Sequence, residues 1–166
     1  MPKTLAPYDL PVDTEERARL IRQYRNGHGE VVQAFAGVAD AELDHSAVPG
    51  EWTPRQIAHH LADSEMMSAI RIRRLLTEEK PVIYGYDEKA FAEKLTSDRP
   101  IDPSLEAMRW ARETCAQLLD RMTEDDWRIV GTHTESGRYT PEDWLRIYAA
   151  HGHDHADQIK RSRGLK

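Results

Sequence analysis

Apolar residues recur at helical spacing in four long stretches of the chain, and most prolines and glycines fall between these stretches. Residues three or four positions apart share one face of an α-helix, so each stretch predicts a helix with one buried stripe. The four expected helices cover about residues 14–38, 53–77, 103–122 and 140–161. Gly27 and Gly29 lie within the first of them, so a kink or a break is expected there.

Two of the expected helices begin with the same capping signal. Thr53-Pro54 is followed by Gln56, and Thr140-Pro141 is followed by Asp143. The threonine side chain accepts from free N–H groups of the first turn, proline suits the first helical position, and the third residue can return the bond. These signals support the second and fourth helices.

The connections between the expected helices are long. A short helix is expected at 87–95 within the connection 78–102, which is long enough to form a lid or a wall over a site. A short capped turn is expected at 123–127, followed by an extended segment at 128–139. The whole pattern predicts an all-α protein, a four-helix bundle with long crossover connections.

Composition limits the classes of protein that this chain can belong to. Its 166 residues suit one domain, 1–166, in which 1–12 form an N-terminal extension. The net charge is -6 and the basic residues are scattered, which argues against a nucleic-acid partner. No segment approaches the roughly 18 consecutive apolar residues of a membrane span, and the N-terminus lacks the apolar core of a signal peptide. We therefore expect a cytoplasmic protein with no membrane partner.

Three of the eight histidines lie close together near the end of the chain. One face of the fourth helix is expected to carry Trp144, Tyr148, His151, His155 and Ile159. His153 points to the opposite side. In the second helix His60 falls on the buried side, whereas His59 is expected to be solvated. Two histidines at positions i and i+4 lie one turn apart, which lets both imidazoles reach a single metal ion.

Spacing alone leaves two interpretations of these histidines open. Buried histidines are often core residues that are satisfied by hydrogen bonds, and histidines also cluster on protein surfaces. A metal bound to neutral imidazole removes the penalty of burying two such rings side by side. The pattern is not that of a zincin, because Gly152 rather than glutamate follows His151.

Several further residues each allow two interpretations in the sequence. Asp63 and Asp154 are either partners that orient an imidazole or solvated acids, and we favour the second interpretation. Gln158 is a candidate contact for a bound ligand or cofactor, or else a packing neighbour of His155. Cys115 is the single cysteine, so no internal disulfide can form, and its place on an apolar stripe favours a core residue.

Two segments resemble the DinB superfamily, and specifically its YfiT-like branch. They are residues 52–64 (WTPRQIAHHLADS) and residues 148–159 (YAAHGHDHADQI). Residues 84–88 and 118–127 are also similar to the family, so the resemblance covers about 43–159. It implies a four-helix bundle that holds one divalent metal ion, zinc or nickel, on His60, His151 and His155. Relatives are often dimeric, which implies a homodimer.

The resemblance also bears on the reaction. Some relatives are thiol-dependent S-transferases that use low-molecular-weight thiols such as bacillithiol or mycothiol, and others carry only the general label of metal-dependent hydrolase. Three histidines leave a coordination position open for chemistry on a small-molecule substrate. We expect a thiol S-transferase first, because thiol transfer needs no protein base and no glutamate lies beside the ligands. A hydrolase and a non-catalytic metal-binding or stress-response protein are the alternatives.

Overall fold

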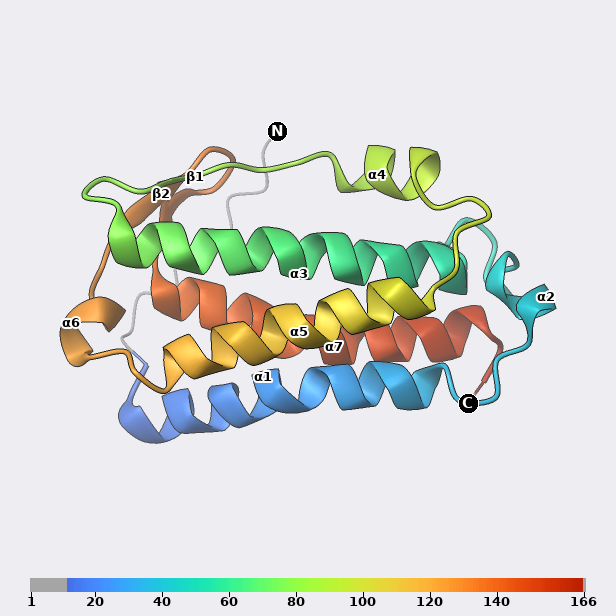
Figure 1. Ribbon diagram of the computed structural model, residues 1–166, viewed down its shortest axis with the longest axis horizontal. Helices are drawn as coiled ribbons and strands as arrows, with labels where there is room; N and C mark the ends of the chain where they lie inside the picture. The colour runs from blue at the N-terminus through green and yellow to red at the C-terminus, as the bar shows by residue number, and fades with distance from the viewer. Residues whose placement is uncertain (1–11, 166) are drawn as a thin grey trace.

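Four long helices lie side by side in the computed structural model, which describes residues 12–165 (Figure 1). They are α1 (Thr14–Ala34), α3 (Pro54–Thr77), α5 (Asp102–Leu119) and α7 (Pro141–Ser162). The predicted four-helix bundle is therefore confirmed. The expected extension at 1–12 lies outside the described residues except for Val12, which is buried.

Shorter elements occupy the connections. They are α2 (Asp40–Leu43), β1 (Val82–Ile83), α4 (Glu88–Lys94), α6 (Glu124–Trp127), β2 (Gly131–His133) and β3 (Gly137–Tyr139). β2 and β3 lie within the segment expected to be extended and form an antiparallel hairpin, with Thr132 opposite Arg138. β1 adds a parallel strand to this hairpin and pairs Val82 with Thr132. Neither β1 nor α2 was predicted, because each is too short to show a periodic pattern.

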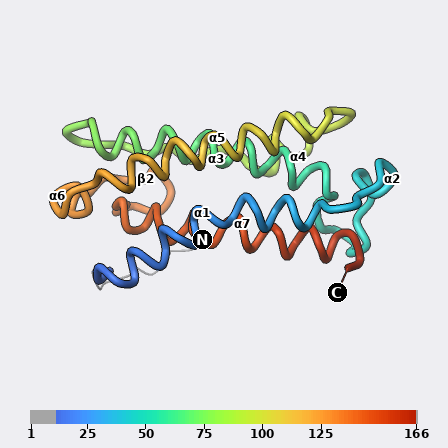
Figure 2. Tube along the Cα trace, turned by 60° about the horizontal axis from the view of Figure 1, so that its bottom comes forward, coloured from blue at the N-terminus to red at the C-terminus, as the bar shows by residue number. Residues whose placement is uncertain are grey.

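The four long helices pack as two layers of parallel pairs. Figure 2 shows α1 with α7 in one layer and α3 with α5 in the other. In the second layer His59 meets Ser104 and Glu65 meets Arg112, so contacts advance together along α3 and α5. Two parallel neighbours that follow one another in sequence need a connection as long as the bundle. The segment 78–101, which contains β1 and α4, makes this crossover along α3 (Figure 1).

The helix boundaries follow from the capping residues. Thr53 and Thr140 accept hydrogen bonds from the main chains of Gln56 and Asp143, whose side chains return the bond, so both predicted capping boxes are present. The first helix ends at Ala34 rather than near 38. It also continues through Gly27 and Gly29, so the expected break is wrong. Packing against neighbouring helices outweighs the roughly 1 kcal/mol by which each glycine weakens a helix.

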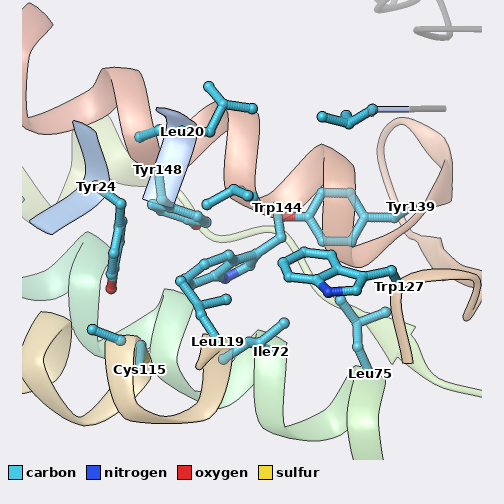
Figure 3. Packing of buried hydrophobic residues seen from close by; sticks show 14 of the residues in the cluster. Leu20, Tyr24, Ile72, Leu75, Cys115, Leu119, Trp127, Tyr139, Trp144 and Tyr148 are labelled. Carbon is cyan, nitrogen blue, oxygen red and sulfur yellow. The ribbon is translucent and has the colours of Figure 1, made fainter. Parts of the chain in front are cut away.

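One half of the core is built around Trp144 (Figure 3). Its ring centroid lies 5.3 Å from that of Tyr24 and 5.2 Å from that of Tyr148. The indole Nε1–H donates to the main-chain oxygen of Ser68 at 2.9 Å, so this buried polar group is satisfied. A second apolar cluster fills the other half of the bundle and includes Val31, Ile57, Leu61, Met108 and Ile159.

A polar layer separates the two apolar clusters. We call it the middle layer, and each long helix gives it one residue: Gly27, Glu65, Arg112 and Gly152. Glu65 and Arg112 form an ion pair that is almost fully withdrawn from solvent, with side-chain exposures of 0% and 3%. Two of the helices that form this layer, α3 and α7, also carry the candidate site. No helix among residues 12–165 is long and apolar enough to cross a membrane.

Candidate metal centre

Two antiparallel helices bring three histidines together. His60 comes from α3, and His151 and His155 come from consecutive turns of α7. The Nε2 atom of His60 lies 3.3 Å from Nε2 of His151 and 3.2 Å from Nε2 of His155. One nitrogen from each ring lies within 4.8 Å of the others. The three residues singled out in the sequence therefore converge on one point.

Burial keeps two of these rings neutral. His60 is 4% exposed, and burial, followed by the nearby His155 and His151, lowers its pKa to about 3. Burial and His151 lower the pKa of His155 to about 4, against smaller opposing effects of Gln158 and Glu65. Both imidazoles are therefore uncharged near neutral pH, which is the form that binds a metal ion. The ring of Trp52 lies 4.9 Å from that of His60, measured between centroids, and covers one side of the cluster.

A hydrogen bond fixes the orientation of His155. Its Nδ1 atom lies 2.7 Å from Oε1 of Gln158, one turn further along α7. Because an amide oxygen only accepts, Nδ1 carries the proton and Nε2 presents a lone pair to the other two histidines. Gln158 was predicted to touch a ligand or to pack beside His155. The structure shows that it contacts His155, and it also lines the cavity in front of the histidines.

The spacing of the three nitrogens suits a divalent ion. Nitrogen ligands about 2.0–2.1 Å from a tetrahedral zinc ion lie about 3.3–3.4 Å from one another. The two separations at His60, 3.3 and 3.2 Å, are close to this value. A set of three imidazoles also matches the ligand preference of zinc, nickel, copper and iron. The residues present therefore fit such an ion.

A cavity of about 470 Å³ opens onto the histidines. Its lining comprises Gly50, Glu51, Trp52, His60, Glu88, His151, His155 and Gln158. Glu88 belongs to the crossover between α3 and α5, so this connection forms a wall of the cavity as its length suggests. A second cavity of about 850 Å³ is lined by Trp52, Glu88, Tyr86 and neighbouring residues. The two cavities adjoin, because Trp52 and Glu88 line both.

Two glutamates of this region were missed in the sequence. Oε2 of Glu51 is buried without a hydrogen-bond partner among the described residues, and Glu51 lines the histidine cavity. Oε1 of Glu65 lies 3.9 Å from Nδ1 of His151. Glu51 precedes the helix, so periodicity says nothing of it. Glu65 sits on the buried side of α3, and that position was the only signal that could have identified it.

The other two histidines considered in the sequence lie outside the cluster. His59 was expected to be solvated, but it is 1% exposed, so this prediction is wrong. Its ring contacts the Ser104 hydroxyl at 2.7 Å and the Arg99 carbonyl at 3.3 Å. The end of the crossover and the start of α5 cover this side of α3, which a helical wheel cannot anticipate. His153 points away as predicted, and its Nε2 contacts the Gln23 carbonyl of α1 at 2.9 Å.

The acids and the cysteine are not part of the group of three histidines. Asp154 is exposed, as favoured in the sequence. Asp63 is half-buried, Oδ2 has no partner within residues 12–165, and burial raises the pKa of its carboxyl. No described hydrogen bond joins either acid to an imidazole. Cys115 is a buried core residue as predicted, and burial raises the pKa of its thiol although Arg73 lies 3.6 Å from the sulfur.

The fold and the histidine cluster define a class of protein: a helical bundle with a candidate divalent-metal centre. The family model of the DinB superfamily matches residues 23–159. The chain therefore belongs to the DinB superfamily, and the resemblance noted in the sequence is confirmed.

Named relatives agree with this assignment. The chain is 40% identical over 118 residues to a protein of Oceanobacillus iheyensis named "Putative metal-dependent hydrolase", covering 71% of this chain and 69% of the relative. It is 34% identical over 151 residues to "Putative metal-dependent hydrolase YfiT" of Bacillus subtilis, covering 89% and 84% of the two chains. The solved structure of YfiT superposes with a TM-score of 0.85 at 31% identity, covering 93% of this chain and 91% of that one. That structure is described as a probable metal-dependent hydrolase with an unusual four-helix bundle topology.

Proposed function

We propose that this protein is a hydrolase that depends on one divalent metal ion, zinc or nickel, held by His60, His151 and His155. The observation that carries the proposal is the approach of three imidazole nitrogens to within 4.8 Å of one another at the wall of a cavity. A bound divalent ion supplies a Lewis acid and lowers the pKa of the small molecule that it binds. The names of the relatives support the same general reaction.

The residues around the ligands have separate roles in this proposal. Gln158 holds the proton of His155 at Nδ1 and so keeps Nε2 free. Trp52 covers His60 and limits the access of water from that side. The cavity of about 470 Å³ admits a small molecule to the three nitrogens.

Glu51 is the candidate general base. Hydrolysis is faster when a carboxylate or imidazole accepts a proton from the attacking water. Glu51 lines the histidine cavity, and its Oε2 atom is buried with no hydrogen-bond partner among the described residues, so that oxygen is free to accept. The sequence favours thiol transfer because no glutamate is adjacent to the ligands in the chain. A glutamate brought into the cavity from the segment before α3 removes that argument.

Thiol S-transfer is the second candidate. It requires room for two molecules, a low-molecular-weight thiol such as bacillithiol and an electrophile. The two adjoining cavities, of about 470 and 850 Å³, offer such room on either side of Trp52 and Glu88. In this reaction Glu51 would have no required role, because a divalent ion held by the three histidines would itself lower the pKa of the thiol.

Glu51→Gln separates the two reactions. Zinc-loaded protein is assayed against a panel of p-nitrophenyl esters and phosphoesters, and against bacillithiol with chloro- or epoxide electrophiles. A hydrolase loses roughly 10²–10⁴-fold in kcat in the variant at unchanged zinc content. Glu88→Gln is the matched control, since Glu88 lines the same cavity but is exposed.

The outcomes separate the candidates. Turnover that requires a thiol and is unaffected by Glu51→Gln contradicts the hydrolase and favours S-transfer. Bound zinc without turnover in either panel favours the non-catalytic metal-binding protein. Zinc that does not bind at all contradicts every version of the proposal.

A further inference from the structure

The second ring nitrogen of His151 makes no hydrogen bond within residues 12–165. This atom, Nδ1, is buried, whereas the equivalent atom of His155 is held by Gln158. A neutral imidazole that offers Nε2 to a cation must carry its proton on Nδ1. A buried N–H group without an acceptor is unfavourable, so His151 needs one.

Glu65 supplies an acceptor at the right place. Its Oε1 atom lies 3.9 Å from Nδ1 of His151, and its side chain is 0% exposed. A shift of about 1 Å brings this pair within the 2.7–2.9 Å range of charge-assisted hydrogen bonds. A carboxylate that accepts from the second nitrogen of a metal-binding histidine fixes the tautomer and orients the ring.

Arg112 holds the Glu65 carboxylate in place. Its Nη1 donates to Oε1 of Glu65, and Ser68 donates to Oε2 at 3.3 Å. The remaining donors of the guanidinium reach two other helices: Nε and Nη2 contact the Tyr24 carbonyl at 3.1 and 2.7 Å, and Nη2 contacts the Tyr148 carbonyl at 2.9 Å. The ion pair therefore joins all four long helices, and Tyr148 lies one turn before His151.

Two glycines make room for this arrangement. A Cβ atom on Gly27 would lie 2.7 Å from Nη2 of Arg112, and one on Gly152 would lie 3.0 Å from Cα of Gly27. Gly152 follows His151 directly in the chain. The close approach of α1 and α7 thus seats the guanidinium beside the same turn of α7 that presents His151.

We propose that Glu65 is a positioning residue for His151: its carboxylate, held by Arg112, accepts from Nδ1–H and keeps Nε2 directed at the point shared with His60 and His155. The inference rests on the proposed metal site and extends it to a buried ion pair that otherwise looks purely structural. If Glu65 has a structural role alone, its substitution affects folding but leaves the Nδ1 proton of His151 and the zinc affinity unchanged.

The test uses the full chain, zinc as the only ligand and two readouts other than activity. Two-bond ¹H–¹⁵N spectra of protein labelled with ¹⁵N-histidine report the tautomer and the Nδ1 proton of His151. Competition with a chromophoric chelator gives the zinc Kd. We expect a slowly exchanging, downfield Nδ1 proton on His151 in the zinc-loaded native protein. In Glu65→Gln this proton moves upfield and the Kd rises by roughly 10–100-fold.

Glu106→Gln is the matched control, because it makes the same change on an exposed residue of α5 that pairs with Arg109. An unchanged Kd and an unchanged His151 proton in Glu65→Gln overturn the inference while native zinc binding preserves the metal site. If the variant does not fold, the native spectrum decides, since a His151 Nδ1 proton in fast exchange with water overturns the inference. A native protein that binds no zinc overturns the inference and the metal site together.

Discussion

Two clusters of buried polar side chains lie close together in this bundle, and they differ in how their hydrogen-bonding groups are satisfied. In the middle layer the Arg112 donors meet the Glu65 carboxylate and two main-chain carbonyls, so donors face acceptors. At the histidines, Nε2 of His60 faces Nε2 of His151 at 3.3 Å and Nε2 of His155 at 3.2 Å. Within residues 12–165, donors and acceptors of the first cluster match, whereas the second cluster brings like groups together without a shared counter-group.

The difference indicates that the middle layer stabilises the bundle, besides the positioning role proposed for Glu65, whereas the histidines serve binding directly. A buried ion pair with matched partners holds helices in register, and removal of one partner is strongly destabilising. A cation is the best partner for several imidazole nitrogens that converge on one point. Each cluster therefore responds to a different perturbation, the first to loss of a charge and the second to addition of a metal ion.

The largest effect is expected from the middle layer. Arg112→Met leaves the Glu65 carboxylate buried without its counter-charge, which lowers the free energy of unfolding by about 3–5 kcal/mol. Urea denaturation of metal-free protein measures this change. Arg109→Met, an exposed arginine one turn earlier in α5, is the control and should change stability little. Equal stabilities of the two variants would remove the distinction between the clusters.

Zinc should stabilise the native protein through the histidines. A free zinc concentration 100 times the Kd adds about 2.7 kcal/mol to the free energy of unfolding, and a chelator reverses the effect. His155→Ala should abolish this increment. His153→Ala, on the opposite face of α7, should retain it. A thermal melt with and without zinc checks both variants, and an increment that survives in His155→Ala contradicts the assignment of the ligands.

The glycine contact between α1 and α7 gives a smaller effect. Gly152→Ala places a methyl group 3.0 Å from the main chain of Gly27, so the helices must separate at a cost of about 1–3 kcal/mol. Gly29→Ala meets nothing within 4 Å and should gain up to about 1 kcal/mol through helix propensity. Denaturant midpoints of the two variants should shift in opposite directions. A shift in the same direction would mean that the close approach has little importance.

The smallest effect concerns the orientation of one ring. Gln158→Ala removes the acceptor 2.7 Å from His155 Nδ1, and the zinc Kd should rise by about tenfold, or about 1.4 kcal/mol. Gln158→Glu restores an acceptor with a charge and should bind zinc at least as tightly as the native protein. Chelator competition measures both constants. Tighter binding by Gln158→Ala would contradict the role of this side chain.

Local sequence signals predicted much of the fold and the three histidines. The capping boxes at Thr53 and Thr140 start the two helices that carry the cluster. The i, i+4 spacing of His151 and His155 on an apolar face indicated that both point inward. These features depend only on residues within one or two helical turns, so the sequence is sufficient to recognise them.

Features that depend on contacts between distant segments could not be predicted. His59 is buried because the segment near Arg99 and Ser104 covers it, and this segment is 40 or more positions away in the chain. In the sequence, Glu65 only interrupts the apolar stripe of its helix. Its ion pair becomes evident when α5 places Arg112 beside it. Glu51 reaches the histidine cavity through the path of the loop before α3. Each case needs the packing of several elements, which a helical wheel does not contain.

The content of metal in the purified protein tests the central claim most directly. Elemental analysis after loading with zinc and gel filtration should find one ion per native chain and almost none in His60→Ala, which removes the nitrogen that lies 3.2–3.3 Å from both partners. A native protein without stoichiometric metal, or a His60→Ala variant that retains a full equivalent, would contradict the claim that these three histidines share one ion.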